Sequence, residues 1–64
     1  NILARPLARM AGDLARHLGP GGTAILSGLL SQDASWFLGA HRRFGLHKAG
    51  AIELNGWATL VLRK

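Results

Sequence analysis

A glycine- and proline-rich turn separates an amphipathic segment from a continuous apolar run in the first half of this chain. The turn is Gly-Pro-Gly-Gly at residues 19–22, and the apolar run at residues 24–30 has no polar side chain until Ser27. Glycine at position 19 supplies a left-handed residue and proline cannot continue a helix, so we expect a helix to end at Leu18. A strand without polar alternation is typical of a parallel α/β sheet covered on both faces.

The length and composition indicate a piece of a larger domain. The chain has 64 residues and no cysteine. A domain of this size buries only about 60% of the surface that its unfolded chain exposes, and without cysteine neither a disulfide nor a thiolate metal site can add stability. The sequence contains neither a run of roughly 18 apolar residues nor a secretory signal, which favours a cytoplasmic location.

A net charge of +5 raises the question of an anionic partner. The eight Lys and Arg residues are scattered along the sequence, and we expect no aromatic residue to lie among the exposed cations as a stacking platform. We therefore expect most of these side chains to lie on solvent-exposed faces of the molecule. Two alternatives stay open: a small basic module that binds RNA with steep salt dependence, and a basic helix at residues 5–18 that lies on an anionic membrane or in a partner's groove.

Two helices are predicted from apolar periodicity. The first has Pro6 in its opening turn, Asp13 within reach of Arg16 and His17, and an apolar stripe at Leu7, Met10, Ala11, Leu14 and Leu18. The second begins with Ser31 as its N-terminal cap and ends at Gly45, and its stripe is Ala34, Phe37, Leu38, His41 and Phe44. Trp36 falls off this stripe, so it either seals the edge of the helix–sheet contact or lines a partner surface. His41 on the stripe favours a buried, hydrogen-bonded histidine over a catalytic one.

The last third of the chain predicts a β-hairpin. Asn55-Gly56 separates two β-rich runs, residues 51–54 and 57–62, and this dipeptide favours a type I′ turn. A two-residue turn would pair Leu54 with Trp57. The second arm is apolar on both faces and suits the inside of a sheet, whereas the first carries Glu53 and suits an edge.

Together these segments resemble the carboxyl-terminal half of a class I S-adenosylmethionine-dependent methyltransferase, a Rossmann-like α/β domain whose sheet ends in an antiparallel hairpin. The resemblance covers the whole chain and is closest to the methyltransferases of ribosomal protein L11. Its most specific parts are Asn-Ile-Leu-Ala at residues 1–4 and Ser-Gly-Leu-Leu at residues 27–30. The turn at residues 18–22 and the final strand at 57–62 are also similar, whereas Phe44-Gly45 reverses the Gly-Phe of the family.

The resemblance implies methyl transfer from S-adenosylmethionine to lysine and α-amino groups of a ribosomal protein. Asn1 matches the asparagine that closes the fourth strand, where its carboxamide would accept the amine N–H beside the cofactor. It is the expected catalytic and cofactor-binding residue, unless it only bonds its own backbone in a turn. Ile2 and Leu3 would line the substrate pocket. Ser27 and Gly28 would contribute at the end of the next strand, unless they only let backbones pack closely.

The resemblance also implies that residues 1–64 form a partial catalytic domain. The glycine-rich turn and the acidic residue that hold the cofactor would precede Asn1, and Gly21-Gly22 does not replace them because it precedes a strand. We therefore expect this chain alone to be inactive. Both helices would cover one face of the sheet, leaving an apolar face and an unpaired edge at Ile25 that favour self-association. No metal is expected, because the three histidines and three acidic residues are dispersed.

Overall fold

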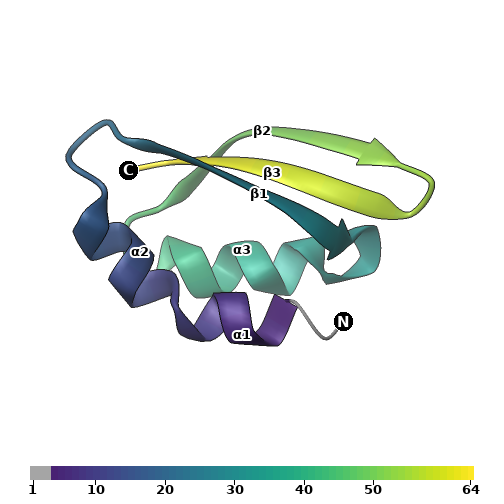
Figure 1. Cartoon of the computed structure of the whole chain (residues 1–64), viewed down its shortest axis with the longest axis horizontal. Helices are drawn as coiled ribbons and strands as arrows, with labels where there is room; N and C mark the ends of the chain where they lie inside the picture. The colour runs from purple at the N-terminus through teal and green to yellow at the C-terminus, as the bar shows by residue number, and fades with distance from the viewer. Residues whose placement is uncertain (1–3) are drawn as a thin grey trace.

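The computed structural model describes residues 4–64, so the predictions for Asn1, Ile2 and Leu3 lie outside the described residues. A layer of helices packs on one face of a three-stranded sheet (Figure 1). The predicted helix–strand–helix–hairpin order is confirmed, as is the position of both helical segments on the same face. No helix in this part of the chain is long and apolar enough to cross a membrane. The elements in chain order are α1 (Ala4–Arg9), α2 (Ala11–His17), β1 (Thr23–Leu30), the 3₁₀ helix η1 (Ser31–Asp33), α3 (Ala34–Arg42), β2 (His47–Leu54) and β3 (Trp57–Arg63).

The predicted hairpin is confirmed in turn type and register, whereas its first arm begins at His47 and not at Ala51 as predicted. Asn55 and Gly56 have φ angles of 52° and 81°, as a type I′ turn requires, and Leu54 pairs with Trp57. The strand order β1-β3-β2 puts the apolar β3 in the centre and β2 at an edge. Both neighbouring pairs are antiparallel, so the parallel sheet expected around β1 is not present among the described residues.

Strand β1 is covered on one face only, which corrects the prediction of a strand buried on both faces. Leu29 is fully buried against the helices, whereas Ile25 on the opposite face is 69% exposed. Among residues 4–64, no strand pairs with the other edge of β1. Strand β1 is apolar on both faces, but the helices of the described chain cover only one of them.

The first predicted helix is divided in two at Met10. Its N–H donates to the Leu7 carbonyl (3.1 Å) and its own carbonyl accepts from Leu14 (2.9 Å), so Met10 ends one helix and opens the next. The residues buried most deeply are small ones, Ala4, Ala11 and Ala15, while Met10 is 55% exposed. The leucines of the predicted stripe are only partly buried around this core. Small side chains allow α1 and α2 to lie close to α3, which a stripe of leucines would prevent.

The second predicted helix begins differently from the expectation but ends as expected. Ser31 opens η1 and makes no capping hydrogen bond, so its predicted role as a cap is wrong. At the other end, Gly45 has a φ of 83°, its N–H bonds to Arg42 and the Leu46 N–H bonds to His41, which is a Schellman motif. Phe44 does not enter the core. A Cβ at Gly12 would lie 3.2 Å from its ring, so the ring rests against α2.

The core lies between the helices and the inner face of the sheet. Phe37 and Leu46 from the helical side meet alternate residues of β3, namely Ala58, Leu60 and Leu62. The intervening residues of β3, Trp57, Thr59 and Val61, face away from the helices with Ile25, Ile52 and Leu54. The sheet therefore carries an open apolar face, as expected from the sequence.

The turn from α2 into β1 is fixed by backbone contacts to Lys64. The left-handed residue is Gly21, with a φ of 78°, and not Gly19 as predicted. Gly21 N–H donates to the Lys64 carbonyl, and Lys64 N–H donates to the Gly22 carbonyl, each at 3.0 Å. The Gly22 N–H bonds to Gly19 at 2.8 Å. These glycines are thus part of a structural turn and not a loop open to a ligand.

Candidate functional site

The candidate site lies at the end of the molecule where β1 and β2 finish. In Figure 1 this end also holds η1 and the first turns of α1 and α3. The carboxyl ends of strands and the amino ends of the following helices are where open α/β sheets bind ligands. The geometry therefore places the candidate residues of β1 at the end that the sequence predicts.

Ser27 and Gly28 form a bulge in β1. The pairing with β3 shifts between Leu26, opposite Leu60, and Leu29, opposite Ala58, so two residues of β1 face the single residue Thr59. Gly28 has a φ of 80°, and both bulge residues are exposed. A bulge re-aims side chains beside functional sites, and the Ser27 side chain is accessible from solvent.

Ser31 adds a buried hydroxyl directly after β1. Its backbone N–H donates to the Gly56 carbonyl at 2.8 Å, which ties the end of β1 to the hairpin turn. Its Oγ is buried and has no hydrogen-bond partner among the described residues. A buried hydroxyl without a partner carries a free-energy cost, so this group is a candidate contact for a ligand or a further segment at this end.

A hollow of about 440 Å³ lies between α1, α2, β1 and α3. Its wall is mainly apolar, with Leu7, Met10, Leu14 and Leu26, and Asp13, His17 and His41 complete the lining. Two histidines that the sequence places on separate elements therefore share one hollow. Among residues 4–64, no group of three or more His, Cys, Asp and Glu side chains could hold a metal ion.

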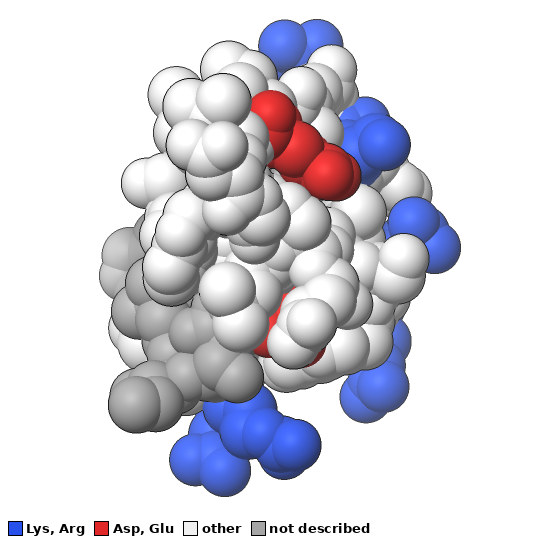
Figure 2. Space-filling view, turned by 90° about the vertical axis from the view of Figure 1, so that its right-hand side faces the viewer, with Lys and Arg blue, Asp and Glu red and all other residues white. Residues whose placement is uncertain are grey.

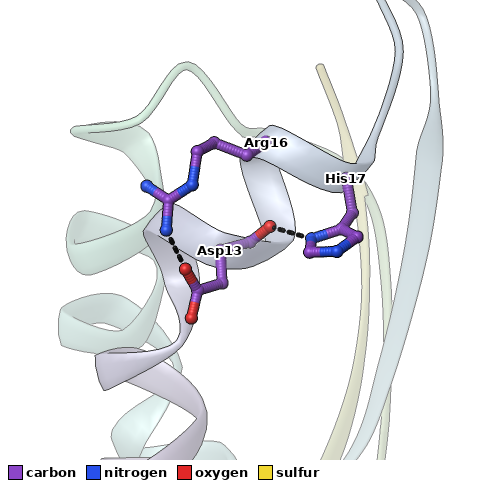
Figure 3. A network of polar contacts seen from close by, with 3 residues as sticks. All are labelled: Asp13, Arg16 and His17. Atoms are coloured by element: carbon purple, nitrogen blue, oxygen red, sulfur yellow. Dashed lines mark hydrogen bonds and ion pairs between the residues drawn. The ribbon is translucent and has the colours of Figure 1, made fainter.

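Both histidines of this hollow are held by the carbonyl four residues before them. His41 is buried as expected, and its Nδ1–H donates to the Phe37 carbonyl at 2.9 Å. The His17 Nδ1–H donates to the backbone carbonyl of Asp13 at 2.8 Å, while the Asp13 carboxylate forms an ion pair with Arg16 (Figure 3). The predicted pairing of Asp13 with Arg16 is confirmed, but His17 meets the backbone of Asp13 and not its carboxylate. These bonds fix the orientation of both rings in the hollow.

A second, smaller hollow of about 240 Å³ joins α1 to the start of α3. It is lined by Arg5, Ala8, Arg9 and Trp36. The Trp36 side chain is 44% exposed, and its Nε1–H donates to Asp33 Oδ1 at 3.3 Å. The expectation that no aromatic residue lies among the exposed cations is therefore wrong. Sequence order conceals this group, since Trp36 stands 27 residues from Arg9 and only helix packing brings them together.

Comparison with known proteins decides the family. The sequence profile of "Ribosomal protein L11 methyltransferase (PrmA)" matches residues 1–64. The chain belongs to the ribosomal protein L11 methyltransferase family. Among curated relatives with that name, the protein of Agrobacterium fabrum is 50% identical over 64 residues, and that of Bradyrhizobium diazoefficiens is 47% identical over 64 residues. Each match covers 100% of this chain.

The chain spans about a fifth of the length of these ribosomal protein L11 methyltransferases, 22% in each case. The described residues do not by themselves fit S-adenosylmethionine. The glycines at 21 and 22 precede β1 and bond to Lys64 and Gly19, and β1 leads into η1 without a glycine-rich loop.

Proposed function

We propose that this chain is the carboxyl-terminal portion of the catalytic domain of an S-adenosylmethionine-dependent protein methyltransferase that methylates lysine and α-amino groups of a ribosomal protein. The match to the ribosomal protein L11 methyltransferase family over residues 1–64 carries the proposal. The apolar outer face of the sheet supports it, because such a face requires cover from further chain. A cytoplasmic location is part of the proposal, since its substrate is a ribosomal protein.

In this proposal the chain positions the substrate amine. The cofactor supplies a methyl group that is already activated, so the protein must hold a neutral amine in line with it and exclude water. The Asn1 carboxamide oxygen accepts the amine N–H and directs the nitrogen lone pair. Ile2 and Leu3 line the pocket, and the exposed bulge at Ser27 and Gly28 forms part of its rim.

The enzymatic role is tested in a chimaera. Residues 1–64 replace the matching segment of the Agrobacterium fabrum protein, which is 50% identical over this length. We expect the chimaera to transfer radiolabelled methyl groups to purified ribosomal protein L11, and Asn1→Ala to lower kcat about 100-fold by misplacing the amine. The matched control Asn55→Gly removes the asparagine of the hairpin turn, where glycine also tolerates the φ of 52°, and leaves kcat unchanged. A chimaera that folds and does not transfer methyl groups contradicts the proposal.

The 64-residue chain alone is expected to be inactive. Titration of the isolated chain with S-adenosylmethionine by calorimetry should give no binding in the micromolar range, because the described residues do not form the pocket. Micromolar binding would show a self-sufficient site and would contradict the proposed partial domain.

A further inference from the structure

We propose that Trp36, Arg5 and Arg9 form a binding site for single-stranded nucleic acid, in which a base stacks on the indole and the two guanidinium groups hold phosphates. This site goes beyond methyl transfer. Its basis is the 240 Å³ hollow whose lining combines one exposed aromatic ring with two exposed cations. Aromatic rings beside a positive surface are the common recognition device for unpaired bases and their backbone.

The hydrogen bond that holds the Trp36 indole covers neither face of the ring. The Trp36 Nε1–H donates to Asp33 Oδ1 at 3.3 Å, and Phe37 meets Trp36 in an edge-type contact with ring centroids 6.3 Å apart. An N–H bond lies in the plane of the ring, so Asp33 holds the ring at its edge and not over its face. A ring fixed in this way loses little conformational entropy when a base stacks on it.

The cations lie on the same side of the molecule as the indole. Arg5 and Arg9 are four residues apart on α1, so their side chains project from one face of the helix. Figure 2, which views the end where α1 and α3 begin, shows a group of Lys and Arg side chains at the lower, helical edge. Guanidinium groups bind phosphate with two parallel hydrogen bonds.

A nucleic acid fits this group better than an acidic peptide or an anionic membrane. An acidic peptide would satisfy the arginines but would offer nothing to the indole that lines the hollow. A membrane surface would require several apolar side chains beside the cations, whereas the hollow offers Trp36 and the small Ala8. An unpaired base with its flanking phosphates uses both kinds of group.

The test is fluorescence anisotropy of a short labelled oligouridine, with oligothymidine as a second probe because both present the same chemistry. Trp36→Leu should weaken binding about tenfold or more, the usual loss for a stacking residue. Trp57→Leu is the matched control, since Trp57 is 53% exposed but lies on the outer face of the sheet, and it should leave the affinity unchanged. In a Trp57→Phe background, addition of either oligonucleotide should quench the fluorescence of Trp36.

The salt dependence separates a phosphate site from the general effect of the net charge. The double variant Arg5→Gln/Arg9→Gln should make the negative slope of log K against log salt less steep by about 1.4, since each phosphate contact on a single strand contributes about 0.7. The control Arg42→Gln/Arg43→Gln removes the same charge from exposed positions at the end of α3 and should leave the slope nearly unchanged. Equal losses in the two double variants, or binding indifferent to Trp36→Leu, overturn the proposal. Stronger binding to polyglutamate or to anionic vesicles than to oligouridine also overturns it.

Discussion

Two glycines with opposite surroundings allow packing to be tested one residue at a time. A Cβ at Gly22 would lie 2.9 Å from the Gly19 carbonyl oxygen and 3.2 Å from Leu18 Cβ, whereas a Cβ at Gly39 would meet nothing within 4 Å. Gly22→Ala should therefore destabilise the chain by about 1–3 kcal/mol, the usual cost of overpacking. Gly39→Ala lies inside α3 and should stabilise it by about 0.5–1 kcal/mol, because alanine favours a helix.

Urea unfolding followed by circular dichroism measures both changes at the residue scale. The two variants add the same methyl group, so an opposite sign excludes a general effect of added apolar surface. If Gly22→Ala leaves the free energy of unfolding unchanged, the turn does not adopt the compact arrangement in which Gly22 N–H bonds to Gly19.

At the scale of the elements, Lys64 joins the end of α2 to the end of β3. Its Nζ donates to the carbonyls of Ala15 and Leu18, the latter at 3.0 Å, and so satisfies carbonyls that the last turn of α2 leaves unpaired. Lys64→Met keeps most of the apolar stem and should cost about 1 kcal/mol. For a domain of this size the midpoint of thermal unfolding should fall by about 4–8 °C. The neighbouring Arg63→Met removes the same charge and should change the midpoint little; an equal fall in both variants would contradict the specific contact.

The elements that neighbouring residues determine are predicted well from the sequence, and those that depend on contacts between distant segments are not. The hairpin is predicted down to its register, because Asn55-Gly56 determines the turn and the turn determines the pairing. The break at Met10 is not predicted, because the apolar periodicity of the first segment runs through this residue without interruption.

The candidate site is likewise predicted in part, with its local features foreseen and its contacts between distant segments not. The bulge at Ser27 and Gly28 lies at the predicted end of β1, but its register shift appears only when β3 is in place. The proximity of Trp36 to Arg5 and Arg9 comes from helix packing alone, so no periodicity in the sequence could indicate it.

At the scale of the whole molecule, the decisive feature is the uncovered face of the sheet. Ile25, Ile52, Leu54 and Trp57 lie on this face and are 69%, 68%, 70% and 53% exposed. They come from all three strands, so they form one apolar surface and not isolated exposed residues. Two such faces can pack against each other at the spacing of about 10 Å that stacked sheets adopt. We therefore predict that the 64-residue chain associates with a second copy of itself through this face.

Sedimentation equilibrium over a range of protein concentrations tests this association, and the emission of Trp57 should shift to the blue as its ring becomes buried. The double variant Ile52→Lys/Leu54→Lys should shift the chain to monomer, because it places two charges on the apolar face at positions that are exposed in a single copy. Met10→Lys also charges an exposed apolar residue, but on the helical layer, and should leave the association unchanged. A chain that is monomeric at every concentration would contradict the prediction, since this apolar face would then be stable in water without cover. If Met10→Lys abolishes association equally, the interface between the two copies lies on the helical layer and not on the sheet.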